Sequence, residues 1–171
     1  MELTLFLKGI EILADLSDKD LTLIADNAQI LDFTDGSVII KRGEPGRFLW
    51  VVYDGEVEVL LTEEDGGRRT VAKLEREQIF GEMSLLTGEP AVLDVIASRW
   101  AKIIRIPRET FSRIIAENPA TLGKFTRLVT KRLLRNEQDD ARERSKNVHR
   151  ENDDPYDLNF TSVYEPMKIL T

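Results

Sequence analysis

Apolar residues recur at helical spacing near the start of the chain and give way to short β-rich runs in its middle. In residues 3–13 apolar side chains stand three or four positions apart, at Leu3, Phe6, Leu7, Ile10 and Leu13. Gly9 interrupts this first predicted helix. Ser17, with Asp20 three residues later, is typical of an N-cap, and it predicts a second short helix with Leu21 and Ile24 facing inward.

Between Gln29 and Ile106 the pattern predicts strands separated by turn residues. The predicted strands cover residues 30–33, 38–40, 48–53, 56–61, 70–74, 92–97 and 101–106. The dipeptide Asp54-Gly55 predicts a hairpin, because glycine accepts a positive φ without steric cost. Many short strands with regular turns predict a mainly β fold with flanking helices, either a small sandwich or a barrel.

Two further helices are predicted after Pro107. Residues 108–117 form one helix, and Asn118-Pro119 separates it from a longer one. The long helix carries an apolar stripe formed by Leu122, Phe125, Val129 and Leu133. This stripe is expected either to cover the barrel or to form the interface of a homodimer. The expected domain boundaries are an N-terminal helical segment 1–28, a β-barrel 29–106, C-terminal helices 107–135, a charged linker 136–166 and a possible following domain from 167.

Composition narrows the function classes. The chain has no cysteine, which excludes disulfides and thiolate metal sites and favours a reducing cytoplasm. A net charge of -7 disfavours nucleic acid and anionic membranes as partners, and no apolar run is long enough to span a bilayer. His149 is the only histidine and stands in a charged segment, so no metal site is expected. No catalytic triad or P-loop can be built from these residues, so we expect no enzymatic activity.

Three segments carry a resemblance to a known family. They are residues 33–46, which contain Asp35-Gly36 and Gly43-Glu44-Pro45-Gly46, residues 51–59 around Asp54-Gly55, and residues 80–90. In this order they resemble the first turn, the central hairpin and the phosphate-binding cassette of the cyclic nucleotide-binding domain family. The likeness covers residues 5–134. It implies a jelly-roll barrel with helices on either side and a regulatory role in which ligand binding moves the C-terminal helices.

The cassette-like segment 80–95 supplies the candidate ligand-binding residues. Gly81 lets the backbone approach a ligand and opens a short helix, whose first residues are Glu82, Met83 and Ser84. The resemblance implies that Glu82 accepts hydrogen bonds from ribose hydroxyls. The alternative is that Glu82 caps its own helix or pairs with a nearby cation.

The sequence departs from the family pattern directly after Pro90. The family places an arginine and then a small or hydroxyl residue there, whereas this chain has Ala91 and Val92. A buried phosphate without its charged partner loses about 2–5 kcal/mol. We therefore expect that neither cAMP nor cGMP binds tightly, unless Arg99, Arg105 or Arg108 supplies the charge from another direction.

Two functional hypotheses stay open. The chain is either a regulatory sensor domain or a ligand-free module for dimerisation or docking. A transcription factor would need a helix-turn-helix domain after the long helix, and a cupin oxygenase would need histidine clusters. Residues 167–171, Met-Lys-Ile-Leu-Thr, resemble the opening strand of acetate and butyrate kinases, which would make the partner a covalently attached effector enzyme.

Overall fold

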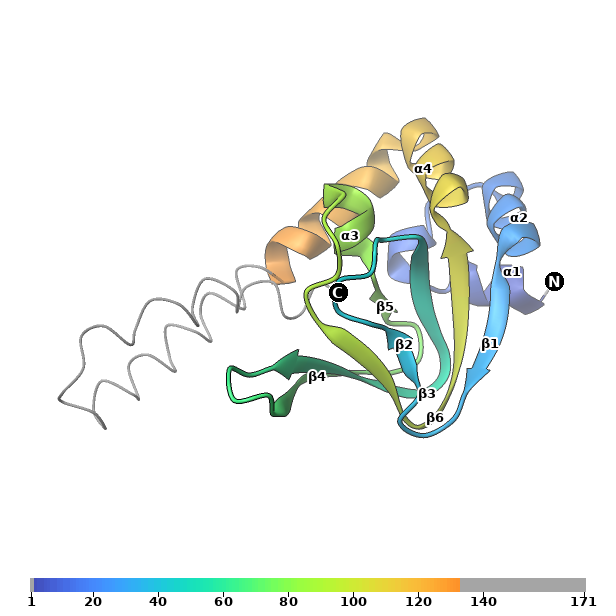
Figure 1. Cartoon of the computed structure of the whole chain (residues 1–171). Helices are drawn as coiled ribbons and strands as arrows, with labels where there is room; N and C mark the ends of the chain where they lie inside the picture. The colour runs from blue at the N-terminus through green and yellow to red at the C-terminus, as the bar shows by residue number, and fades with distance from the viewer. Residues whose placement is uncertain (1, 133–171) are drawn as a thin grey trace.

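The computed structural model describes residues 2–132, which form an antiparallel sheet wrapped into a barrel with helices on one side (Figure 1). The helices before the sheet are α1 (Glu2–Lys8), the 3-10 helix η1 (Glu11–Leu13) and α2 (Asp18–Asn27). The strands are β1 (Gln29–Phe33), β2 (Val38–Ile40), β3 (Phe48–Thr62), β4 (Arg68–Leu74), β5 (Ile79–Phe80) and β6 (Asp94–Pro107). The short helix α3 (Glu82–Thr87) lies between β5 and β6, and α4 (Arg108–Glu117) and a C-terminal helix over residues 119–132 follow. The expected mainly β fold with flanking helices is confirmed.

The long strands β3 and β6 form the spine of the sheet. They pair antiparallel from Phe48 opposite Pro107 to Leu60 opposite Asp94, and the strand order is β1-β6-β3-β4. The shorter strands complete the sheet, with β2 on β6 and β5 on β3.

The predicted hairpin at Asp54-Gly55 is wrong, because β3 runs through these residues as one strand. The register with β6 shifts on either side of them, between Val52 and Asp54 and again between Gly55 and Glu56. Gly55 has the expected positive φ of 81°, but this φ accompanies a bend within the strand and not a hairpin turn. The predicted strands 92–97 and 101–106 are likewise one strand, β6, which bends at Arg99, where φ is 69°.

The strands are apolar on both faces because two hydrophobic cores lie on opposite sides of the sheet. Along β3, Leu49 and Val51 belong to the core under the helices, while Trp50 and Val52 belong to the core inside the barrel. The helices contribute their own stripes to the first core, namely Leu7, Leu13, Leu21, Ile24, Phe111, Ile114 and Phe125. The C-terminal helix is therefore packed against the rest of the domain.

The N-terminal helices follow the sequence prediction closely. The Ser17 hydroxyl accepts a hydrogen bond from the Asp20 N–H at 3.1 Å, which confirms the N-cap of α2. The chain turns at Gly9 between α1 and η1, so the predicted first helix is divided there. The expected segments 136–166 and 167–171 lie outside the described residues.

Gly55 is required for a steric reason as well as for its φ. A Cβ built on it would lie 2.2 Å from the Trp100 carbonyl oxygen. Gly66 has a similar φ of 87°, but a Cβ there would meet nothing within 4 Å. We expect Gly66→Ala to lower the free energy of unfolding by about 1 kcal/mol, from the left-handed backbone alone, and Gly55→Ala by about 2–5 kcal/mol, from backbone and clash together.

Urea denaturation of both variants measures this difference directly. The midpoint should shift little for Gly66→Ala and strongly for Gly55→Ala, with unchanged m-values. Equal effects of the two substitutions would contradict the close approach of β3 and β6 at this bend.

Candidate ligand-binding site

A cavity of about 400 Å³ opens beside α3, which is within the usual size range of small-molecule sites. Residues from β2, the loop after β2, β3, β6 and the cassette line it: Ile39, Ile40, Glu44, Pro45, Gly46, Arg47, Phe48, Trp50, Gly81, Ser84, Ala91 and Arg105. The predicted site residues Gly81, Ser84 and Ala91 are thus brought to one cavity. Glu82 and Met83 are buried next to it in α3.

Aromatic side chains form one wall of the cavity. The Trp50 ring stacks on Phe80 with centroids 5.9 Å apart, and Phe48 meets Trp50 edge-on at 5.4 Å. Gly81 is fitted to this wall, because its φ is 80° and a Cβ on it would lie 2.8 Å from Trp50 Cδ1. The domain's own packing therefore requires glycine at this position.

The loop after β2 is fastened to the cassette by backbone contacts. The Gly43 N–H donates to the Ala91 carbonyl at 2.7 Å, and the Ala91 N–H donates to the Glu44 carbonyl at 2.9 Å. Gly46 packs on Ser84 so closely that a Cβ on it would lie 2.5 Å from the Ser84 Cβ. The Ala91 N–H is therefore occupied by the protein itself.

Where the family pattern places its arginine, the cavity wall is apolar. Ala91 is buried in the barrel core, and Val92 is half-buried against the same core. The nearby carboxylate of Asp94 accepts a hydrogen bond from the Arg42 N–H at 2.8 Å. The cassette side of this cavity thus offers neither a side-chain cation nor a hydroxyl at Ala91 and Val92.

Two arginines also line this cavity. Arg105 was one of the cations suggested by the sequence, but its Nε donates to Gln29 Oε1 at 2.6 Å and its guanidinium lies 4.4 Å from the centre of the Phe48 ring. Arg47 is exposed at the rim, and sequence reasoning missed it. The signal available was its place directly after Gly46, in the segment that resembles the family's first turn.

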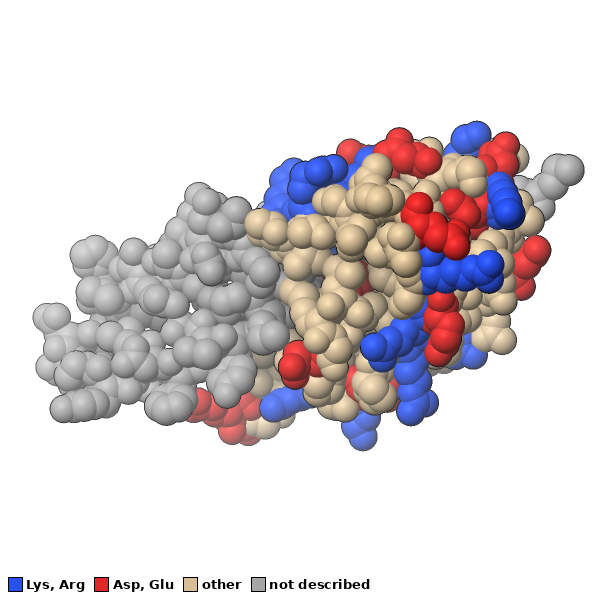
Figure 2. Space-filling model, turned by 90° about the horizontal axis from the view of Figure 1, so that it is seen from above, with Lys and Arg blue, Asp and Glu red and all other residues tan. Residues whose placement is uncertain are grey.

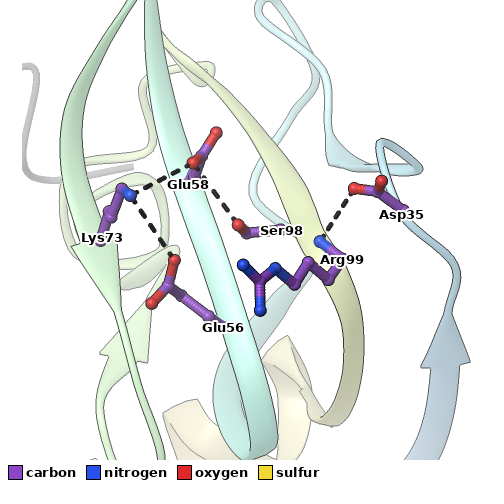
Figure 3. Close-up of polar contacts among 6 residues, drawn as sticks. All are labelled: Asp35, Glu56, Glu58, Lys73, Ser98 and Arg99. Atoms are coloured by element: carbon purple, nitrogen blue, oxygen red, sulfur yellow. Dashed lines mark hydrogen bonds and ion pairs between the residues drawn. The ribbon is translucent and has the colours of Figure 1, made fainter.

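The other two candidate cations stand elsewhere. Arg108 begins α4 and is absent from the cavity lining. Arg99 lies at the bend of β6, where its backbone N–H donates to Asp35 Oδ1 at 2.8 Å (Figure 3). The nearby Lys73 Nζ lies 3.9 Å from Glu56 and 3.7 Å from Glu58. Lys73 is exposed and the two glutamates are half-buried, and pairs near the surface contribute at most about 1 kcal/mol, so we interpret this cluster as a support of the strand bend.

The strongest electrostatic contact of the site joins α3 to the C-terminal helix. Glu82 has no exposed surface, and Arg132, whose side chain is 13% exposed, donates from Nη1 to Glu82 Oε1. Arg132 Nη2 also donates to the Ile79 carbonyl at 3.3 Å. Sequence reasoning missed Arg132 as a site residue, because only the packed structure shows that the helix turns this side chain toward the buried carboxylate.

The second oxygen of Glu82, Oε2, is buried and has no hydrogen-bond partner among residues 2–132. Burial raises the pKa of Glu82 above its ordinary value, and the Arg132 charge partly offsets that rise. An unsatisfied buried carboxylate oxygen is a costly feature unless a ligand or water supplies a donor.

The residues predicted as a dimer seam lie in different surroundings. Phe125 is buried and packs edge-on against Phe111 at 5.0 Å, within the domain's own core. Leu122 is 38% exposed and Val129 is half-buried, while Leu133 lies outside the described residues. In residues 2–132 no cluster of His, Cys, Asp and Glu could hold a metal ion, and no helix is long and apolar enough to cross a membrane.

A β-barrel with a cavity beside a short helix, and a C-terminal helix tied to that short helix, define the class of this domain. The model of the cyclic nucleotide-binding domain matches residues 30–118, and the chain belongs to this family. The resemblance to the cyclic nucleotide-binding domain family, inferred from the sequence, is therefore confirmed.

The curated relatives are regulatory proteins. The regulatory subunit of cAMP-dependent protein kinase from Dictyostelium discoideum is 30% identical over 112 residues, which cover 64% of this chain and 34% of the relative. The subunit from Mucor circinelloides is 31% identical over 110 residues and is covered to 26%. This chain thus matches about a third or less of the length of these relatives.

Solved structures confirm the jelly-roll barrel. The regulatory domain of Toxoplasma gondii protein kinase A with cAMP has a TM-score of 0.65 and 27% identity, covering 72% of this chain and 48% of that one. The regulatory subunit of a cAMP-independent protein kinase A from Trypanosoma cruzi bound to guanosine has a TM-score of 0.66 and 25% identity, covering 74% and 44%. The catabolite activator protein of Thermus thermophilus has a TM-score of 0.67 and 25% identity, covering 75% and 60%.

The Glu82–Arg132 pair yields a pH-dependent prediction. Arg132→Met leaves a buried carboxylate without its cation, which costs about 3–5 kcal/mol near neutral pH. Burial then raises the pKa of Glu82 unopposed, so between the unfolded and folded pKa values the folded state binds more protons and stability falls as pH rises. We expect the deficit of Arg132→Met in urea unfolding to be smaller at about pH 5 than at about pH 7.5.

Two matched variants control for the loss of packing. The double variant Glu82→Gln with Arg132→Met removes both charges and should recover most of the stability and lose the added pH dependence. Arg127→Met, on an exposed position of the same helix, should change stability by less than about 0.5 kcal/mol. If the loss of unfolding free energy in Arg132→Met did not depend on pH, the assignment of Glu82 and Arg132 as an ionised pair would be wrong.

Proposed function

We propose that this chain is a non-catalytic regulatory sensor domain, acting in the cytoplasm, that holds cyclic nucleotides weakly and takes an uncharged nucleoside-like ligand in the cavity beside α3. The observation that carries the proposal is the apolar side chain of Ala91 in the cavity wall, where the family pattern has arginine. Val92, where the pattern has a hydroxyl, packs on the barrel core outside the cavity lining. The relatives named as kinase regulatory subunits support a role in controlling a partner or an attached effector domain.

Charge decides between a nucleoside and its cyclic phosphate. Placing a phosphate beside Ala91 removes its hydration, while the Ala91 N–H is already donated to Glu44. The missing charged partner costs about 2–5 kcal/mol, which corresponds to roughly 30-fold to several-thousand-fold in affinity. A nucleoside carries no phosphate and avoids this cost.

The remaining features suit a sugar and a base. Oε2 of Glu82, which has no hydrogen-bond partner among residues 2–132, is the acceptor that we propose for a ribose hydroxyl. Glu82 is fully buried and is not in the cavity lining, so the hydroxyl would have to reach Oε2 past the lining residue Gly81. The aromatic wall of Phe48 and Trp50 offers a surface on which a base can pack. The guanosine-bound Trypanosoma cruzi relative supports this ligand class.

A Trypanosoma brucei relative supports the importance of the missing arginine. Its triple mutant, in which one substitution replaces threonine by arginine and another replaces valine by alanine, is described as bound to cAMP in the A site. That structure has a TM-score of 0.63 and 26% identity, covering 70% of this chain and 44% of that one.

The Glu82–Arg132 pair provides the route from ligand to output. A hydroxyl that donates to Glu82 stabilises its carboxylate and changes its interaction with Arg132, which belongs to the C-terminal helix. Ligand binding and the position of this helix are then coupled, and the coupling acts equally in both directions. A partner that holds the helix would in turn change ligand affinity.

The proposal predicts that cyclic nucleotide binding can be installed. Ala91→Arg with Val92→Ser supplies a fork of donors and a hydroxyl on the cassette side of the cavity. We expect calorimetry to show cAMP affinity at least about 100-fold higher in this double variant than in the wild type, whose Kd should be about 1 mM or weaker. The matched control Ala91→Leu with Val92→Ser adds bulk without charge and should gain nothing.

Two outcomes would overturn this account of the cavity. Micromolar binding of cAMP by the wild type would show that Arg47 or Arg105 already supplies the charge. A folded arginine variant with no gain would show that the loop held to Ala91 excludes phosphate for steric reasons, which favours the docking module.

The docking alternative has its own observation, the exposed Leu122 on the C-terminal helix. If two copies pair through Leu122 and Val129, sedimentation at tens of micromolar should show a dimer that Leu122→Glu converts to a monomer. Thr126→Glu, one turn along the same exposed face, serves as a charge control at a position that is already polar. A monomeric wild type would reject the seam.

A further inference from the structure

A second, larger cavity lies on the helical side of the domain. It has a volume of about 710 Å³ and lies between η1, the connection from β4 to β5 and the C-terminal helix. Apolar side chains in its lining are Ile10, Ile12, Ile79 and Leu128, and the basic ones are Arg76, Lys124, Arg127, Lys131 and Arg132. Glu11 and Glu77 are the acidic side chains in that lining. We call this cavity the basic groove.

Most basic side chains of the groove are held by the domain itself. Lys124 Nζ lies 2.6 Å from Asp15 Oδ2 and donates to the Glu11 carbonyl at 3.1 Å. Arg76 donates to the Tyr53 carbonyl at 2.7 Å and lies over the Phe6 ring. Arg132 is paired with Glu82. These contacts fix the walls of the groove.

Arg127 and Lys131 differ, because neither makes an ion pair or a side-chain hydrogen bond with any residue between 2 and 132. They are exposed and stand four positions apart on one helix face, where like charges repel. Figure 2 looks down on the helical side and shows Lys and Arg side chains gathered near the end of the C-terminal helix. This local excess of positive charge contrasts with the net charge of -7 of the chain.

We propose that the basic groove binds an acidic peptide segment of a partner protein, with an apolar side chain packed on Ile10 and Leu128 between carboxylates that pair with Arg127 and Lys131. Charge complementarity favours this occupant, because carboxylates would remove the repulsion along the helix. The apolar floor favours a peptide over a nucleic acid, whose backbone would bring phosphates but no aliphatic anchor. Arg132 lies in the same lining, so the peptide would contact the pair that joins the helix to α3.

The test uses the whole 171-residue chain and a fluorescent peptide of repeated Glu-Glu-Leu units. Fluorescence anisotropy at about 50 mM salt should show saturable binding that weakens as salt is raised. A peptide of Gln-Gln-Leu units, which lacks the charge, and one of Glu-Glu-Gly units, which lacks the anchor, should each bind at least about tenfold more weakly. The test is independent of the cavity beside α3, because no nucleoside is added.

A charge-reversal pair locates the peptide on the groove. Arg127→Glu with Lys131→Glu should weaken binding at least about tenfold, whereas Lys19→Glu with Arg113→Glu makes the same change in net charge on α2 and α4 and should leave it unchanged. If the reversed groove variant fails to fold, Arg127→Gln with Lys131→Gln replaces it. Equal effects of the two pairs, no binding of the acidic peptide, or groove-dependent binding of a single-stranded oligonucleotide in preference to it would overturn the proposal.

Discussion

The buried ion pair between Glu82 and Arg132 links the helix beside the candidate ligand site to the C-terminal helix. It joins α3, a helix of six residues, to a residue of the C-terminal helix that lies 50 positions later in the chain. A buried pair of this kind contributes little net stability, because desolvation offsets its attraction, but breaking it is costly. Under the proposed function, a ligand beside α3 or a partner on the C-terminal helix acts by altering this contact.

The cavity beside α3, which we propose as the ligand site, is built on backbone that the domain's own packing holds in place. Its glycines are fixed by packing on Trp50 and Ser84, and the loop from Gly43 to Gly46 is held to Ala91 by backbone hydrogen bonds. At the position where the family pattern has arginine, Ala91 contributes hydrocarbon to the cavity wall. The proposed difference in ligand depends on this side chain and not on the backbone around it.

Much of the fold could be predicted from local patterns, because each depends on nearby residues. The cap at Ser17, the glycine at position 81 and the helix from residue 82 are of this kind. The hairpin at Asp54-Gly55 was mispredicted because a turn dipeptide has the same sequence as a strand bend, and only the long-range pairing of β3 with β6 distinguishes them. Arg132 and Arg47 were missed as site residues because their places depend on how distant elements pack around the cassette, which residue spacing does not encode.

Calorimetric titration of the wild-type chain with guanosine and with its 3′,5′-cyclic monophosphate in the same buffer measures how the cavity discriminates between the two. The same pair of titrations is then made with adenosine and cAMP. The two ligands of each pair differ by the cyclic phosphate alone. We expect at least one nucleoside to bind at least about tenfold more tightly than its cyclic phosphate, because the cavity wall at Ala91 offers no partner for the phosphate charge. Tighter binding of both cyclic phosphates than of their nucleosides would contradict it.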